Sequence, residues 1–424
     1  MFLGCSIGTA ASPSLAAFFV FRILTAFQGT AFLIVGASCI GDIYRPTERA
    51  TAMGWFLSGT LVGAISFQEL SSCWTSVFNT NVHPGPAFGP FIGGIIVTFT
   101  SWRVIFWLQS GLAGIAVVGA FFLLPETIHY LKSEELEGLP LRQKLHVLWE
   151  MTNPWRVIKL FRYPNLLTVS VASSCLVWNM YSLLTPIRYV LNPRFNLVSP
   201  IQSGLFYLSP GFGYILGTFF GGRWADRTVK KWLKIRNGER VSEDRLRSCV
   251  PFLGIVIPAC MLIYGWSVEQ RVGGIPLPVI VMFMQGVAQL FCFPSLNTYC
   301  LDVMQAQSGE VIAGNYMVRY LFAALGTATV LPAIEAIGVG WFSTISASFL
   351  ALGALMVVAN VRWGRAARER IDRKRRAARA ERGNEQVATR MEKDDHHNAG
   401  KEKADVDDTI VGEPEGEKND GDMV

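Results

Sequence analysis

Apolar runs long enough to cross a membrane recur along the sequence, and they constrain the fold more than any other feature. Hydrophobic residues make up 51% of the chain and charged residues only 17%, whereas soluble domains carry about 25% charged residues. A bilayer offers no water to the backbone, so runs of about 20 apolar residues must form helices. The pattern predicts an all-α, polytopic membrane helical bundle.

The apolar runs form two groups, four before a charged central segment and six after it. The predicted membrane segments are 1–11, 15–40, 51–100 (interrupted), 104–124, 166–190, 204–222, 250–268, 276–300, 311–337 and 339–361. This grouping predicts a partial N-terminal bundle over 1–127, an amphiphilic central loop over 128–165, a six-span C-terminal bundle over 166–361 and a tail over 362–424.

Lysine and arginine in the short loops predict the orientation. Arg45, Arg49, the central loop, the segment 223–247 and the tail share one side of this topology, which the positive-inside rule makes cytoplasmic. Ten basic and three acidic residues over 362–382 suit anionic membrane lipid. The polar, acidic remainder from Gly383 on is predicted to be disordered. We expect a monomer in the plasma membrane with a cytoplasmic C-terminus.

A glycine-rich stretch with the pattern GxxxGPxxGG lies within the third of these segments. Glycines four apart lie on one helix face, where they allow close helix packing, while prolines bend the axis. Its motif residues are Gly85, Gly89, Pro90, Gly93 and Gly94. The polar segment 64–85 interrupts the helix, and joining Gly63 to Pro86 restores a four-residue glycine spacing. We interpret 64–85 as a retained intron; a genuine extra loop is the alternative.

Motifs of hydrolytic and nucleotide-driven chemistry are absent from the sequence. It has no GxSxG, HExxH or P-loop pattern, its five histidines lie outside the predicted spans, and its eight cysteines form no CxxC pair. We therefore expect no enzyme activity, no metal site, no cofactor and no nucleic-acid partner. A proton or other ion gradient is the energy source that remains.

Charges inside spans are costly and mark candidate functional sites. Arg22 and Arg319 are the two cations predicted to face a cavity and to affect proton coupling, although Arg22 has the alternative of reaching the membrane surface. Asp302 and Glu310 are expected near span ends, solvated or paired structurally, and Glu335 lies near the opposite end.

Polar and aromatic residues inside the spans are candidates for contacts with a small-molecule substrate. Several recur every four residues along one helix face, although hydrogen bonds between helices use the same residue types. The candidates are Gln28, Trp178, Asn179, Tyr181, Gln285, Gln289, Phe293, Asn297, Asn315 and Tyr316.

The loop after the sixth predicted span carries a motif of known spacing. The sequence GRWADRTVKK, residues 222–231, resembles the GxxxD(R/K)xG(R/K)(R/K) loop of the major facilitator superfamily, with Val229 in place of the usual glycine. Residues 22–29 resemble the family's RxxxxQG element, with five residues instead of four between Arg22 and Gln28, and 124–127 resemble the exit of its sixth span. The resemblance implies a cytoplasmic gate. Its residues are Gly222, Asp226, Arg227, Lys230 and Lys231.

The glycine-rich stretch resembles the antiporter signature of the family's fifth span, and the chain looks closest to fungal drug:proton antiporters with twelve spans. The resemblance implies that about ten of twelve spans are present, with two spans and a first loop motif expected before Met1. It implies proton-coupled export of small amphipathic compounds by alternating access. The alternatives are a non-transporting remnant, and an importer of polyamines, sugars or other nutrients.

Overall fold

The computed structural model describes residues 1–62, 96, 99–123, 140, 149, 153–196, 200–304 and 307–410. The segment 64–85 and the five residues of the glycine-proline motif lie outside this part of the chain. The chain divides into two compact units, Met1–Ala367 and Arg368–Val424.

Helices account for the regular structure of the described residues, in agreement with the predicted all-α class. The elements are α1 (Phe2–Ala10), α2 (Leu15–Ile43), α3 (Arg49–Val62), α6 (Arg103–Leu123), α8 (Trp155–Leu160), α9 (Pro164–Leu184), the π-helical turn η2 (Ile187–Leu191), α10 (Asn192–Arg194), α11 (Pro200–Ile235), the 3-10 turn η3 (Ser242–Ser248), the π-helical turn η4 (Phe252–Val256), α12 (Ile257–Gln270), α13 (Pro276–Val303) and α14 (Ser308–Ile410).

Local sequence explains several helix boundaries. The Ser14 side chain accepts a hydrogen bond from the Ala17 amide and caps α2, as serine does at helix starts. Pro276 occupies the first turn of α13, where its missing N–H costs nothing. Within α14, Gly338 has φ 83° and breaks the helix, because glycine tolerates positive φ. This break separates the predicted segments 311–337 and 339–361.

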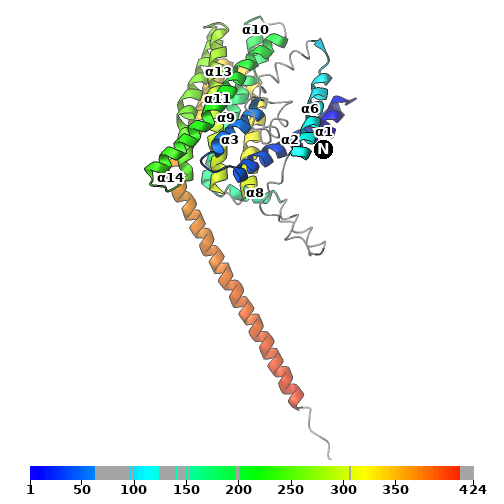
Figure 1. Ribbon diagram of the computed structural model, residues 1–424, viewed down its shortest axis with the longest axis vertical. Coiled ribbons are helices and arrows are strands. Elements are labelled where there is room, and N and C mark those ends of the chain that lie inside the picture. Colours follow the sequence, from blue (N-terminus) through cyan, green and yellow to red (C-terminus); the bar gives the residue numbers. More distant parts are fainter. Residues whose placement is uncertain are drawn as a thin grey trace, which may run out of the picture. The chain divides into compact units, whose positions relative to one another are not determined.

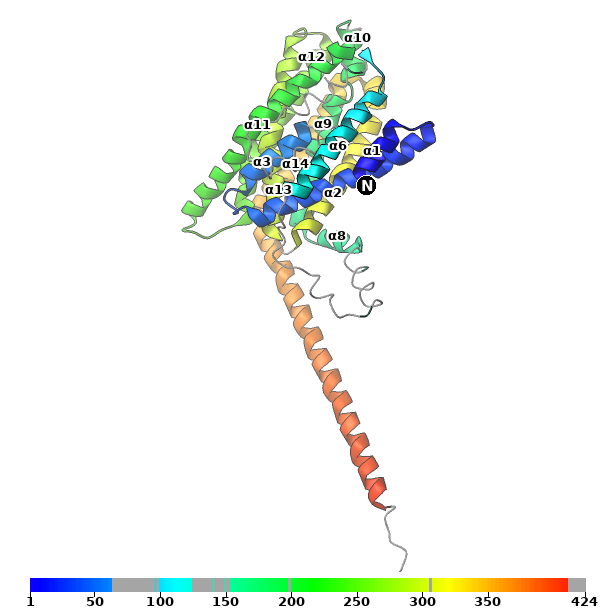
Figure 2. The same cartoon turned by 45° about the vertical axis from the view of Figure 1, so that its right-hand side comes forward.

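Three helices, α3, α11 and α13, pack against one another within the first unit, with α11 and α13 side by side along much of their length (Figures 1 and 2). Glycines permit this approach. A Cβ added to Gly213 would lie 2.3 Å from the Phe283 carbonyl oxygen, and one added to Gly221 would lie 2.2 Å from that of Leu290. Gly217 lies between them on the same face, so α11 carries a small-residue stripe.

A second group contains α1, α2 and α6, in which α1 packs against both of the others (Figure 1). Large apolar side chains remain exposed here, including Phe27 at 77% and Phe121 at 82%. Exposed apolar surface of this extent marks contact with lipid or other apolar material.

Five described helices are long and apolar enough to cross a membrane. They are Leu15–Ile43, Pro164–Arg194, Phe252–Gln270, Pro276–Val303 and Ser308–Ile371. Each overlaps a predicted segment, and the last contains two of them. A shorter apolar helix covers Arg103–Gly119.

The second unit differs from the sequence expectation, because residues from Gly383 to Ile410 are helical rather than disordered. The residues just before this stretch, 368–382, are rich in arginine and alanine, which both favour helices, and α14 continues from them into it. A weak ion pair four residues apart, Glu369 to Arg373 at 3.9 Å, adds to that local preference.

Candidate functional site

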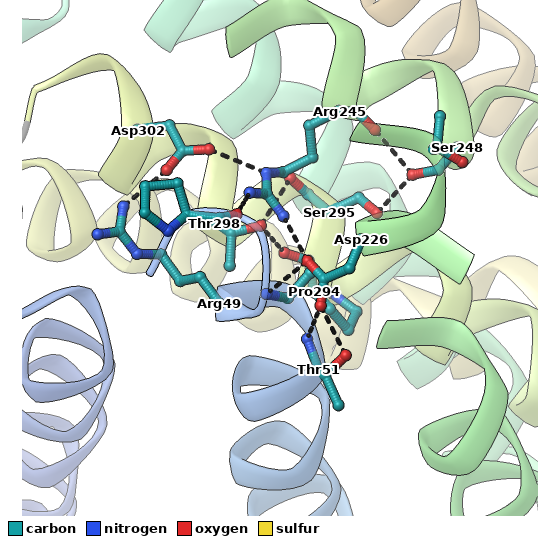
Figure 3. A network of polar contacts seen from close by, with 12 residues as sticks. Arg49, Thr51, Asp226, Arg245, Ser248, Pro294, Ser295, Thr298 and Asp302 are labelled. Atoms are coloured by element: carbon teal, nitrogen blue, oxygen red, sulfur yellow. Dashed lines mark hydrogen bonds and ion pairs between the residues drawn. The ribbon is translucent and has the colours of Figure 1, made fainter. Parts of the chain in front are cut away.

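A buried charge network joins the two halves of the sequence, and Asp302 at the end of α13 is its centre (Figure 3). Its carboxylate oxygens lie 2.6 Å from Arg49 Nη1, 2.9 Å from Arg240 Nη2 and 2.9 Å from Arg245 Nε. The Asp302 side chain is only 2% exposed. Of the expected alternatives for this residue, the structure shows pairing rather than solvation.

Asp226 on α11 forms the second part of the network. Its carboxylate accepts hydrogen bonds from the backbone amides of Ala50 and Thr51 at 3.2 and 2.8 Å, and from the Thr51 hydroxyl at 2.6 Å. These amides belong to the first turn of α3, where backbone donors lack helical partners and the helix dipole favours an anion. An aspartate from the second half of the chain therefore caps a helix of the first half.

Gly222 makes that contact possible. A Cβ at this position would lie 2.6 Å from both the Ala50 carbonyl oxygen and Thr51 Cα. No side chain larger than hydrogen fits between α11 and the start of α3 without a shift. The first glycine and the aspartate of the loop motif thus act on the same helix end.

Arg245 of η3 connects the two carboxylates. Its guanidinium lies 3.3 Å from Asp226 and 2.9 Å from Asp302, and it also donates to the Pro46 carbonyl oxygen. Ser248 holds η3 in place, because its hydroxyl donates to the Arg245 carbonyl oxygen at 2.7 Å and lies 2.8 Å from that of Ser295 on α13 (Figure 3). Sequence reasoning missed Arg245, since nothing in the local sequence separates it from its exposed basic neighbours.

Burial sets the electrostatics of this network. It raises the pKa of Asp226 above the usual aspartate value, while the hydrogen bond from Thr51 and the charge of Arg245 oppose the rise. Burial also lowers the pKa of Arg49, against the attraction of Asp302. Desolvated charges of this kind are tolerated because they are paired. Separating the two sequence halves here would leave buried charges without partners.

A pocket of about 380 Å³ lies beside Asp226, between α3 and α11. Arg227 and Lys230 of the predicted gate line it, together with Trp55 and Glu48. Lys231 is exposed and does not line it. The motif residues therefore differ in their contacts: Gly222 and Asp226 contact α3, while Arg227 and Lys230 line the neighbouring pocket.

A second polar cluster surrounds Arg319 on α14. The guanidinium carbon lies 4.7 Å from the ring centroids of both Phe293 and Tyr316. Nη1 is 3.5 Å from Asn297 Oδ1, which also accepts a hydrogen bond from Asn315 at 2.9 Å. Five of the predicted site residues therefore come together.

The rest of the predicted stripe on α13 makes hydrogen bonds between helices. Gln285 donates to Asn179 of α9, and Gln289 accepts from Tyr214 of α11 at 3.0 Å. Both glutamines are buried. These contacts match the interhelical alternative. Tyr214 was missed because an isolated tyrosine in a glycine-rich span carries no polar periodicity.

The remaining candidates lie elsewhere. Arg22 of α2 is half-buried, with its guanidinium carbon 5.2 Å from the Phe106 ring centroid in α6. Gln28 contacts Met1 Sδ at 3.7 Å. Trp178 donates to Ser346 at 3.3 Å and packs edge-on against Phe349. Among the described residues, no hydrogen bond or ring contact joins Arg22 to Arg319.

Helices of membrane-spanning length and a charge network between two sequence halves define a class, the secondary transporters with two helical bundles. The family model for the Major Facilitator Superfamily matches residues 74–327. The chain therefore belongs to the major facilitator superfamily, a family of membrane transporters rather than enzymes.

Curated relatives are fungal transporters. The chain is 24% identical to the MFS transporter cpaT of Aspergillus oryzae, over 83% of this chain and 68% of that one. It is 23% identical to the efflux pump radE of Floropilus chiversii, over 84% and 64%. The MFS antiporter QDR3 of Candida albicans is 22% identical, over 88% and 68%. The chain thus spans about two thirds of the length of these relatives.

Solved structures of the same fold include the human organic anion transporter MFSD10, with a TM-score of 0.56 and 14% identity over 84% of this chain and 76% of that one. The proton:xylose symporter XylE matches with a TM-score of 0.51 and 13% identity, over 85% and 77%. At this identity the likeness shows the fold alone.

Proposed function

We propose that this chain is a secondary active transporter that exports small amphipathic compounds by alternating access, driven by inward proton flow. The observation that carries the proposal is the network of Asp226, Arg245 and Asp302 with the start of α3. Alternating access requires two bundles that close and open around a central site. Buried, paired charges between the two halves stabilise a conformation in which the bundles are closed at the end where the network lies. These charge pairs have to separate when the bundles open at that end.

Export and proton coupling rest on sequence resemblance. The motif at residues 85–94 resembles an antiporter signature, and the relatives include proteins named as an efflux pump and an antiporter. We further propose that the network lies at the cytoplasmic end, in the plasma membrane, because the basic loop residues of the first half, the loop 223–247 and the tail share that side.

The test is a flux measurement on the purified full chain in proteoliposomes. An imposed pH gradient, acidic on the side corresponding to the cell exterior, should drive a panel of labelled amphipathic compounds toward that acidic side. Collapse of the gradient with a protonophore should abolish the movement. Movement of the compounds in the same direction as the protons would favour the alternative function, an importer. Absence of gradient-dependent flux would favour a non-transporting protein.

A variant pair connects the flux to the network. Asp226→Asn removes the charge that caps α3 and pairs with Arg245, so it should lower flux by about tenfold or more, since charged hydrogen bonds of about 1.5–3 kcal/mol are lost. Lys234→Gln is the matched control, because Lys234 lies on the same helix outside the gate motif and is exposed. Its flux should stay within about twofold of the parent. Equal effects of the two changes would remove the network from the mechanism.

A further inference from the structure

Arg319 is a buried cation whose surroundings differ from those of the other buried arginines. It is 6% exposed. Arg49 and Arg245 are comparably buried, and both pair with Asp302. Among the described residues, Arg319 has no carboxylate within ion-pair distance. Its neighbours are an amide oxygen at 3.5 Å and two aromatic rings. A cation in a span normally faces an opposite charge, and Arg319 lacks the counter-charge that Arg49 and Arg245 have among the described residues.

Unsatisfied buried atoms surround the same guanidinium. Asn297 Oδ1 accepts from both Asn315 and Arg319, which fixes the orientation of its amide group and leaves its Nδ2 without a partner among the described residues. The Tyr316 hydroxyl is also buried, and it donates to no residue in the described part of the chain. Buried polar atoms are almost always hydrogen-bonded. Two free donors beside a guanidinium are therefore a set that an anionic acceptor would satisfy.

The walls of the site are aromatic. Phe293 is fully buried against the guanidinium, and Tyr316 lies 6.0 Å from Tyr320, centroid to centroid. Rings of this kind bind the apolar or aromatic part of a ligand by stacking and burial.

We infer that Arg319, Asn297 and Tyr316 bind the carboxylate of an amphipathic organic anion, whose apolar body packs on Phe293 and the adjacent tyrosines. This inference rests on the proposed transport function and names its substrate class. The planar guanidinium matches a carboxylate in shape and charge. A cationic compound would meet the Arg319 charge in a desolvated setting, which selects against it.

The test measures binding to the purified full chain in nanodiscs with three probes of one size: naphthoate, naphthamide and naphthylmethylammonium. Each is followed by equilibrium binding of the radiolabelled compound at one pH. The carboxylate should bind about tenfold or more tightly than the neutral amide, and the ammonium compound should bind most weakly. Equal affinity for naphthoate and naphthamide, or tightest binding of the cation, would overturn the inference.

Two variants locate the binding. Arg319→Gln should weaken the binding of naphthoate about tenfold or more and leave the affinity for naphthamide within about twofold of the parent value. Asn297→Asp keeps the arginine but places a carboxylate beside it, so this variant should bind naphthoate more weakly by the same factor. Arg103→Gln, which removes an exposed cation at the start of α6, is the matched control and should bind naphthoate like the parent. Size-exclusion profile and thermal unfolding establish that each variant is folded.

The outcomes separate this inference from the transport function. If naphthoate binds selectively and its binding depends on Arg319, but no gradient-dependent flux occurs, the binding site is supported and the transport function is contradicted. If neutral or cationic compounds are transported, this flux persists in folded Arg319→Gln and the parent shows no preference for naphthoate, the substrate class is contradicted and the transport function is supported. A folded parent chain that binds none of the three probes also counts against the site.

Discussion

At the scale of single residues, buried charges in the described part of the chain fall into two kinds. Asp302 and Asp226 are surrounded by donors from both halves of the sequence, so their charge holds helices together. Arg319 lies among neutral amides and rings, and no ion pair joins it to another described residue. Sequence alone placed both kinds in or near spans. It did not show which of them were paired, because pairing depends on residues distant along the chain.

The first prediction concerns Asp302. Asp302→Asn should lower the free energy of unfolding by about 3–5 kcal/mol, because it leaves buried Arg49 and Arg245 without their counter-charge. Thermal or denaturant unfolding in detergent measures the loss. The control is Arg240→Gln, whose side chain is 33% exposed and whose removal should cost at most about 1 kcal/mol. An Asp302→Asn protein as stable as Arg240→Gln would show that the network contributes little.

At the scale of elements, the glycine stripe on α11 decides how closely α11 and α13 approach. Positions Gly213, Gly217 and Gly221 face the backbone of α13, where a Cβ would meet main-chain atoms that have no alternative rotamer. The sequence showed a glycine-rich span without showing which helix it packs against. The gate motif is a second example. The sequence predicted a cytoplasmic gate without showing its partner, and in the structure Asp226 of the motif contacts the start of α3.

The second prediction uses that stripe. Gly213→Ala should destabilise the protein by about 1–3 kcal/mol through overpacking against the Phe283 carbonyl. The control is Gly111→Ala in α6, where a Cβ would meet nothing within 4 Å. Because alanine favours a helix over glycine, the control should be neutral or about 0.5–1 kcal/mol more stable. Thermal unfolding in one detergent compares the two, and an equal response of both variants would contradict the packing argument.

The third prediction concerns residues 64–85, which lie outside the described part of the chain. If this segment is a retained intron, the main transcript should encode Gly63 followed directly by Pro86, restoring glycines at four-residue intervals. Sequencing cDNA across this position decides between the alternatives. A main transcript that keeps the segment would establish the extra loop.

At the scale of the whole molecule, the two halves of the chain meet most extensively where α3 packs against α11 and α13. None of these elements lies next to α3 in the sequence. Family membership explains why such a meeting exists, since two helical bundles close around a shared site in this class of transporter.

The fourth prediction concerns orientation. An epitope fused after Val424 should be protected from protease and antibody in intact cells and become accessible when the plasma membrane is permeabilised, because the basic residues of 362–382 favour the cytoplasmic side. A second epitope inserted after Gly273, in the predicted outer loop, is the control and should be accessible in intact cells. Accessible C-terminal and protected loop epitopes would reverse the predicted topology.

The sequence by itself determined the helical class, the positions of most spans and the break at Gly338, because length, hydropathy and glycine conformation are local properties. It also identified the gate motif and the residues around Arg319 as candidates. Only the tertiary structure decided that Asp226 caps α3, that Arg245 bridges two carboxylates and that Arg319 has no acidic neighbour among the described residues. Those facts depend on contacts between segments distant in sequence, and periodicity carries no information about such contacts.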